Sequence, residues 1–184
     1  MKYFTPDRWV RMQRGASKEG FEKAYDEWER AVREYEGELK RIFPGGRRFS
    51  DLRRFALHYS LHDADLQACW FGPKGDKLNL LVRPELPQER LFLLVYSLAG
   101  EPVVRRGVLP EEFTSKRAVW MYDELGLLHG VEDHEELAFT HNILLSTGCE
   151  YVIRFSNLTL TRPQPWPDLS SASDRRSPSL QQTA

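Results

Sequence analysis

The sequence lacks most of the features that mark the specialised classes of protein. Among its 184 residues are two cysteines, Cys69 and Cys149, which lie far apart along the chain. Their spacing excludes a cysteine zinc site and the disulfide framework of a small secreted domain. We expect the two thiols to be buried as small hydrophobic groups in a reducing compartment.

Long apolar runs and a strong net charge are also missing. No stretch approaches the roughly 18 apolar residues of a membrane helix, and the opening MKYFTPDRWV has no apolar signal region, so we expect a cytoplasmic protein without membrane contact. The net charge of −1 provides no general attraction for nucleic acid. Residues 1–62 carry 14 Lys and Arg against 10 Asp and Glu, while residues 63–162 carry 10 against 15. We interpret this imbalance as complementarity within the molecule.

The sequence contains no recognisable catalytic motif. A G-x-S-x-G elbow, a Gly-rich phosphate loop, an H-E-x-x-H pair and a zinc-spaced cysteine pair are all absent. No cofactor is predicted, and the pattern favours a protein that is not an enzyme.

The composition, with 41% hydrophobic and 29% charged residues, predicts one globular domain over residues 1–162. Residues 1–60 have helical spacing. Thr5-Pro6 opens a short helix, Ser17 caps a long one that runs to about Phe43, and Ser50 begins a third.

The long helix over residues 17–43 carries a regular apolar stripe. Its members follow one another at spacings of four and three residues: Phe21, Tyr25, Trp28, Val32, Tyr35, Leu39 and Ile42. Such a stripe can form a coiled-coil homodimer or pack across its own domain. The aromatic residues favour packing within the domain, and the homodimer stays the less favoured alternative.

Residues 61–162 read mainly as β-strands. Strands are expected at 65–71, 78–82, 91–98, 103–108, 118–128, 138–146 and 150–161, the last two joined by a hairpin at Thr147-Gly148. The sequence therefore predicts an α+β fold: N-terminal helices, one of them long, followed by an antiparallel sheet curled into a sandwich or partly open barrel. Residues 163–184 are rich in Pro and Ser and are predicted to be a disordered tail, with Trp166 as its one possible anchor.

The change from helical to strand spacing falls on His62, Asp63 and Asp65. Imidazole and carboxylate groups can hold Zn, Mn or Fe, so these residues are candidate metal ligands. The alternative is structural: the Asp63 carboxylate accepts backbone N–H bonds at the turn, and Asp63→Asn then costs about 1–3 kcal/mol. If the strand begins at residue 61, alternation points His62 away from both aspartates, which favours the structural interpretation.

His141 is the fourth candidate. It is expected on the apolar face of a strand, where a histidine is more often part of the core, and it gains a binding role only if it meets Asp63 or Asp65. An acidic loop at residues 129–136 is a weaker cation candidate. A ligand space lined by Trp70, Phe71, Trp120 and Tyr122 is a further alternative to simple core packing.

Several short motifs carry a resemblance to a known family: Met1-Lys2-Tyr3-Phe4-Thr5-Pro6, Asp26-Glu27-Trp28-Glu29, Leu61-His62-Asp63-Ala64, and His141 with Ile143-Leu144, Tyr151 and Arg154-Phe155. Over residues 1 to about 160 this pattern resembles a family of short bacterial proteins without an assigned activity. The resemblance implies a bacterial cytoplasmic protein and transfers no catalytic residue. The Leu-His-Asp turn is also similar to that of small proteins encoded beside polymorphic toxins, some of them immunity proteins.

Two functions remain at this point. The leading hypothesis is a non-catalytic protein-interaction module, immunity-like if the second resemblance holds, which binds another protein through its acidic sheet or its helix stripe. The rival is a metal-dependent enzyme or metal-binding protein that uses His62, Asp63, Asp65 and His141.

Overall fold

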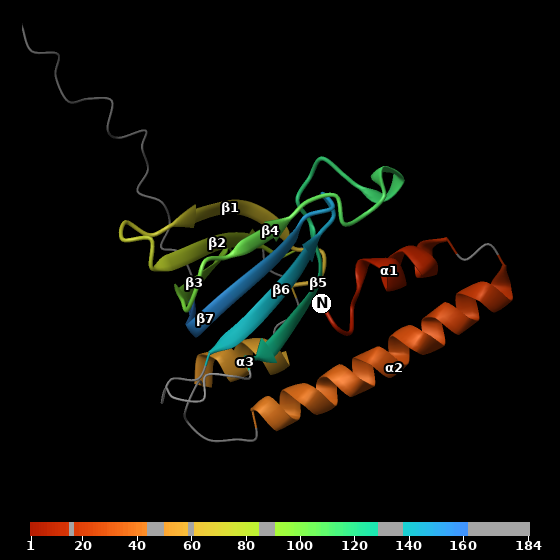
Figure 1. The fold of residues 1–184 in the computed structure, drawn as a ribbon, viewed down its shortest axis with the longest axis horizontal. Helices are drawn as coiled ribbons and strands as arrows, with labels where there is room; N and C mark the ends of the chain where they lie inside the picture. Colours follow the sequence, from red (N-terminus) through yellow and green to blue (C-terminus); the bar gives the residue numbers. More distant parts are fainter. Residues whose placement is uncertain (15–16, 44–49, 59–60, 85–90, 129–137, 162–184) are drawn as a thin grey trace, which may run out of the picture.

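The computed structural model describes residues 1–14, 17–43, 50–58, 61–84, 91–128 and 138–161. Within these ranges three helices precede an antiparallel sheet that curls into a half-barrel (Figure 1), which confirms the predicted α+β fold. The acidic loop at 129–136 and the tail at 163–184, with Trp166, lie outside the described residues.

The helices begin where the capping residues predicted. Helix α1 spans Pro6–Gln13, and the Thr5 hydroxyl accepts a hydrogen bond from the Arg8 amide. Helix α2 spans Lys18–Ile42, with the Ser17 hydroxyl accepting from the Gly20 amide at 3.1 Å. Each cap satisfies an amide that has no partner inside its helix. Helix α3 spans Ser50–His58.

In the part of the chain that the structure describes, seven strands form one sheet in the order β1-β2-β3-β7-β6-β5, with the short β4 paired to β7. Their bounds are β1 Asp65–Phe71, β2 Lys77–Arg83, β3 Phe92–Leu98, β4 Val103–Arg105, β5 Trp120–Leu127, β6 Phe139–Leu145 and β7 Glu150–Thr161; a 3-10 turn, Glu111–Phe113, precedes β5. Six of the seven predicted strands have observed ends within two residues of the predicted ends; the exception is 103–108. Strand β4 ends early, at Arg105, and Gly107 has a positive φ of 65° that is incompatible with an extended strand.

The two ends of the sheet meet at one corner. There the Leu66 amide donates to the Ala118 carbonyl at 2.8 Å and the Trp120 amide donates to the Ala64 carbonyl at 2.7 Å. Past Leu66 the two chains separate, and within the described residues the outer edge of β1 has no further backbone partner. The barrel is therefore closed at one corner and open beyond it.

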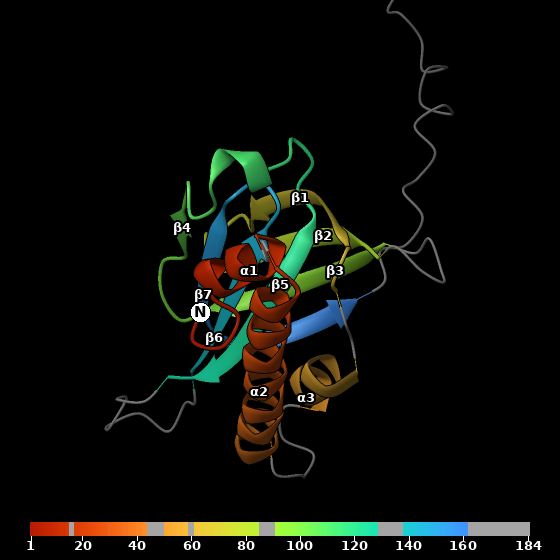
Figure 2. The same ribbon diagram turned by 90° about the vertical axis from the view of Figure 1, so that its right-hand side faces the viewer.

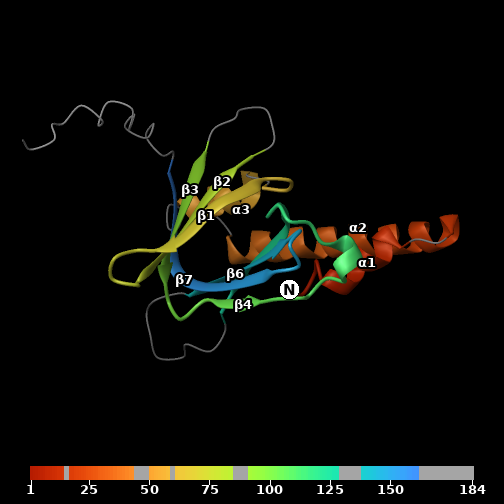
Figure 3. The ribbon, with the colours of Figure 1, turned by 90° about the horizontal axis from the view of Figure 1, so that it is seen from above.

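The main core fills the concave side of the sheet. The C-terminal part of α2 and the neighbouring α3 cover this core (Figure 2), contributing Leu39, Phe43, Leu52 and Phe55. A smaller cluster of Leu109, Met121 and Leu144 packs with Trp9 and Val10 of α1. The N-terminal half of α2 runs out past the sheet with α1 alongside it (Figure 3). No helix within the described ranges is both long enough and apolar enough to cross a membrane.

Candidate functional site

His141 lies at the centre of a buried polar network inside the sheet. Its ring is fully buried, with 0% of its surface exposed. Nδ1 lies 2.8 Å from the Tyr96 hydroxyl on β3, and Nε2 lies 2.9 Å from Oδ2 of Asp123 on β5. The other carboxylate oxygen of Asp123 accepts a hydrogen bond from Nε1 of Trp120 at 3.0 Å. Three strands thus meet at one imidazole.

The chemistry of the partners fixes the ring tautomer. A carboxylate can only accept hydrogen bonds, so Nε2 carries the proton and donates to Asp123. In a neutral ring Nδ1 then accepts from the Tyr96 hydroxyl. Every donor in this chain of groups finds an acceptor, which is the condition for a buried polar network to stabilise a core.

Aromatic side chains enclose the network. The rings of Phe55, Trp120 and Tyr96 lie with centroids 5.6, 5.6 and 5.8 Å from that of His141. Burial raises the pKa of Tyr96 well above its usual value, and the nearby Asp123 carboxylate adds to the effect. Both ring nitrogens are hydrogen-bonded and the ring is fully buried. The arrangement therefore supports a structural role for His141, joining β6 to β3 and β5, rather than a role as a general base or a metal ligand.

The second His–Asp pair lies on the surface. His62 Nδ1 is 2.7 Å from Asp63 Oδ2, yet the two side chains are 48% and 53% exposed. Asp63 has a positive φ of 65°, and its amide donates to the Trp120 carbonyl at 2.8 Å. The predicted turn is present, but the backbone of Asp63 anchors it, and its carboxylate pairs with His62 instead of with the predicted backbone amides.

Asp65 has a third and separate environment. Its buried carboxylate receives two hydrogen bonds from the Arg117 guanidinium, one from Nε and one from an NH2 group. This bidentate contact ties the start of β1 to the segment that precedes β5. Of the four candidates, only His62 and Asp63 are in contact with each other, and the described residues contain no group of three or more His, Cys, Asp or Glu arranged to hold a metal.

Two buried glutamates form polar sites that sequence analysis missed. The Glu124 carboxylate accepts the backbone amides of Lys2, Tyr3 and Phe4 at 2.5–2.6 Å. Glu150 pairs with Arg105 at 3.1 Å and with the amino group of Met1 at 2.9 Å. Both carboxylates hold the first residues of the chain against the sheet.

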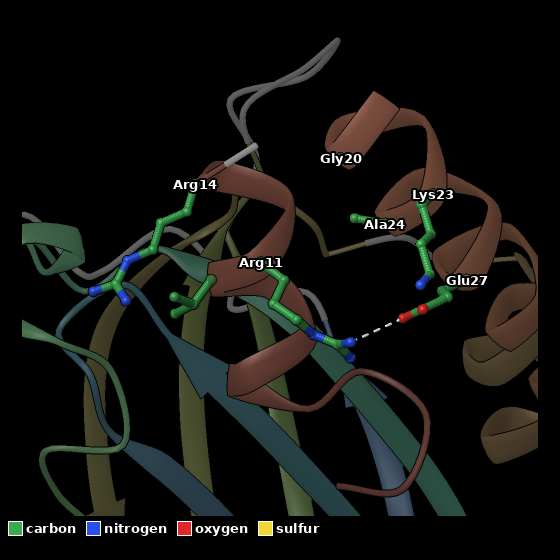
Figure 4. Close-up of a pocket in the computed structure, with 7 residues that line it drawn as sticks. Arg11, Arg14, Gly20, Lys23, Ala24 and Glu27 are labelled. Atoms are coloured by element: carbon green, nitrogen blue, oxygen red, sulfur yellow. Dashed lines mark ion pairs between the residues drawn. The ribbon is translucent and has the colours of Figure 1, made fainter. Parts of the chain in front are cut away.

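A pocket of about 400 Å³ lies between α1 and α2. Within it Arg11 reaches across to Glu27, 3.1 Å away, and Lys23 points toward the same carboxylate (Figure 4). Arg14 points away toward Glu112 and pairs with it at 2.5 Å. The positive charge of the pocket is largely balanced by these contacts.

Exposed apolar groups form the other notable surface. On the half of α2 that runs past the sheet, Phe21 and Tyr25 are 47% and 41% exposed, and their rings stack at 6.1 Å. Near the open edge of the half-barrel, Trp70 and Phe71 are also exposed, while Trp120 is core. The expected core packing is therefore wrong for Trp70 and Phe71, and the alternative of a ligand space lined by all these aromatics is not formed either.

The prediction that both cysteines are buried is wrong. Both thiols are free; Cys69 is exposed and Cys149 is partly exposed. Cys69 lies on β1 beyond the corner where the barrel closes, so no neighbouring strand covers it.

The hydrogen-bond partners of His141 could not be predicted from the sequence either. Tyr96 lies in a strand recognised only as apolar on both faces, and Asp123 lies in a strand with partial alternation. Which residues face His141 depends on the pairing register of β5 with β6 and on how the sheet curls.

A scan against models of protein families finds no match for this sequence, and a search of curated proteins likewise finds none.

Proposed function

We propose that this chain is a non-catalytic interaction module that binds another protein through the N-terminal half of α2. The observation that carries the proposal is the exposed aromatic pair of Phe21 and Tyr25, which continues to Trp28 at 6.0 Å from Tyr25. We name these three residues the α2 aromatic patch.

The two halves of the α2 stripe differ in what covers them. Tyr35, Leu39 and Ile42 pack on the core of the same chain. Phe21 and Tyr25 have no such cover, although aromatic side chains are the residues that most often dominate binding energy at protein interfaces. Burial of these two rings by a partner would add apolar contact where the domain itself leaves it unused.

A homodimer through this helix is less favoured. A stable coiled coil needs about three to four heptads of continuous apolar seam. The α2 aromatic patch covers about one heptad, because Tyr35, Leu39 and Ile42 further along the stripe pack on the core. A different protein with its own apolar surface is therefore the better partner, and a toxin is the partner class that the immunity-like resemblance would supply.

Paired capture experiments test this proposal. Wild-type protein, a Phe21→Ala/Tyr25→Ala variant and a Glu22→Ala/Asp26→Ala control on the same helix are used as baits, with unfolding curves to verify that all three fold. We expect a partner that the wild type and the control retain and that the aromatic variant binds at least about tenfold more weakly. Equal retention by all three baits would contradict the proposal, as would no retention above an unrelated bait.

The metal-dependent alternative has no structural observation in its favour. Its four residues occupy three separate environments: the buried network around His141, the exposed His62–Asp63 pair and the Asp65–Arg117 contact. Elemental analysis and unfolding in Zn²⁺, Mn²⁺ or EDTA decide it, and we expect no bound metal and no shift in Tm. We further propose a bacterial, cytoplasmic setting, which the family resemblance and the two free thiols support.

A further inference from the structure

The outer edge of β1 combines features that strand edges of stable proteins normally avoid. Residues 66–71 carry no charge and no proline, and Cys69, Trp70 and Phe71 are exposed. Edges are usually protected by charged side chains, by proline or by a covering segment, because an unpaired strand binds other strands. Within the described residues this edge has a backbone partner only up to Leu66.

The ladder identifies which peptide groups are unpaired. The Gly72 amide bonds to the Lys77 carbonyl, so Gly72 and Lys77 form a hydrogen-bonded pair. In an antiparallel ladder such pairs alternate, and with the register of Trp70 opposite Asn79 this turns the N–H and C=O of Cys69 and Phe71 away from β2. These outward groups continue the line of bonds that Leu66 begins with Ala118.

We propose that the β1 edge binds an extended segment of a partner protein as an added strand, one with alternating apolar side chains and an acidic residue at one end. The added strand would pair with Cys69 and Phe71, in the way that strand addition gives affinity through main-chain bonds. Its side chains would lie beside Phe71 on one face of the sheet and beside Trp70 on the other.

Charge selects the acidic residue and argues against a second copy of this chain. The unpaired part of the β1 edge begins next to Ala118, close in sequence to the exposed Lys116. At its other end, the 72–77 hairpin carries Lys74 and Lys77 against one acid, Asp76. In a two-fold β1–β1 pair that places Cys69 opposite its counterpart, the hairpin of one copy would lie against Lys116 of the other. Like charges would then oppose each other, whereas a carboxylate on the added strand would meet Lys116 favourably.

A displayed library of random seven-residue segments, panned against the full chain, tests the proposal. Cys69→Pro removes an outward N–H and leaves the bonds to β2 in place, since proline is tolerated at strand edges; Cys69→Ala is the matched control for the thiol. We expect enriched segments with apolar alternation and a terminal Asp or Glu. They should bind Cys69→Pro about tenfold more weakly than Cys69→Ala, and Lys116→Glu should reverse the preferred end charge.

Amide exchange in the wild type provides a readout that does not depend on how the proline variant folds. An enriched segment should slow exchange at Cys69 and Phe71 specifically. Four results would overturn the proposal: no enrichment, binding unaffected by Cys69→Pro while its fold is intact, slow exchange at these amides in the unliganded chain, or self-association through β1. Segments that instead bind the α2 aromatic patch would overturn this inference and still support the proposed function.

Discussion

Two histidine–aspartate contacts among the described residues have almost equal length and very different surroundings. Nε2 of His141 lies 2.9 Å from Asp123 in the core, and Nδ1 of His62 lies 2.7 Å from Asp63 at the surface. The buried pair continues to Tyr96 and Trp120. A contact distance therefore says little about what the contact contributes.

Water explains the difference between the pairs. At the surface, water replaces the partner when a hydrogen bond is lost, so an exposed ion pair contributes about 0–1 kcal/mol. No water replaces a lost partner at the fully buried His141 and Tyr96, so a removal there leaves polar groups without partners, whereas the Asp123 side chain is 26% exposed.

His141→Ala should produce the largest effect. It opens a cavity among Phe55, Tyr96 and Trp120 and leaves the Tyr96 hydroxyl and one oxygen of Asp123 unpaired. We expect a loss of about 3–5 kcal/mol in the free energy of unfolding, measured by urea denaturation. His62→Ala is the matched change in the exposed pair and should stay within about 0.5 kcal/mol. Equal losses in the two variants would show that burial does not separate the pairs.

Asp123→Ala should cost about 2–3 kcal/mol, because Trp120 Nε1 and His141 Nε2 then both lose their acceptor. Asp123→Asn should cost less. Its oxygen can still accept from Trp120, and its NH2 group can donate to Nε2 if the ring proton moves to Nδ1 and donates to Tyr96. Nitrogen chemical shifts of the ring should report the Nε2–H tautomer in the wild type and the Nδ1–H tautomer in the variant. An unchanged tautomer would contradict this assignment.

The buried network should also weaken the protein in alkali. Burial raises the pKa of Tyr96 in the folded state, with Asp123 adding to it, so above about pH 10 the unfolded chain loses a proton that the folded chain retains. Stability is therefore complete below the unfolded pKa and falls as pH rises, by about 1.4 kcal/mol per pH unit for this one group. Unfolding curves from pH 9 to 11.5 should show a shallower decline in Tyr96→Phe than in the wild type. Parallel declines would place the alkaline sensitivity in other groups.

The sequence was informative wherever one local rule decides the outcome. Hydroxyl caps set the starts of α1 and α2, and alternation located the strands to within a residue or two, apart from β4. It failed where distant segments meet. The stripe of α2 does not reveal that the core covers only its C-terminal part and leaves Tyr25 exposed. Nor does the sequence show where the barrel opens, which decides that Cys69 is exposed.

The candidate site shows the same division. The sequence points to three ionisable residues at the helix-to-sheet transition and to His141 in a late strand. The partners of Asp65 and His141 come from segments far along the chain: Arg117 for Asp65, and Asp123 with Tyr96 for His141. The pairing register and the curvature of the sheet decide which residues come into contact, and neither can be predicted from a single strand.

Asp63 gives the smallest expected effect and the sharpest test of what the turn needs. If its carboxylate held the turn, Asp63→Asn would cost about 1–3 kcal/mol. The carboxylate is instead half exposed beside His62, while the residue adopts a φ of 65°, a conformation that Asp and Asn both tolerate. We therefore expect Asp63→Asn to change the free energy of unfolding by less than about 0.5 kcal/mol, and Asp63→Val to cost about 1–2 kcal/mol through backbone strain alone. Both substitutions remove the contact with a charged carboxylate, so only the backbone requirement can separate them in urea denaturation. A large loss of unfolding free energy in Asp63→Asn would show that the carboxylate holds the turn after all. The exposed His62–Asp63 pair would then contribute to stability as the His141–Asp123 pair does.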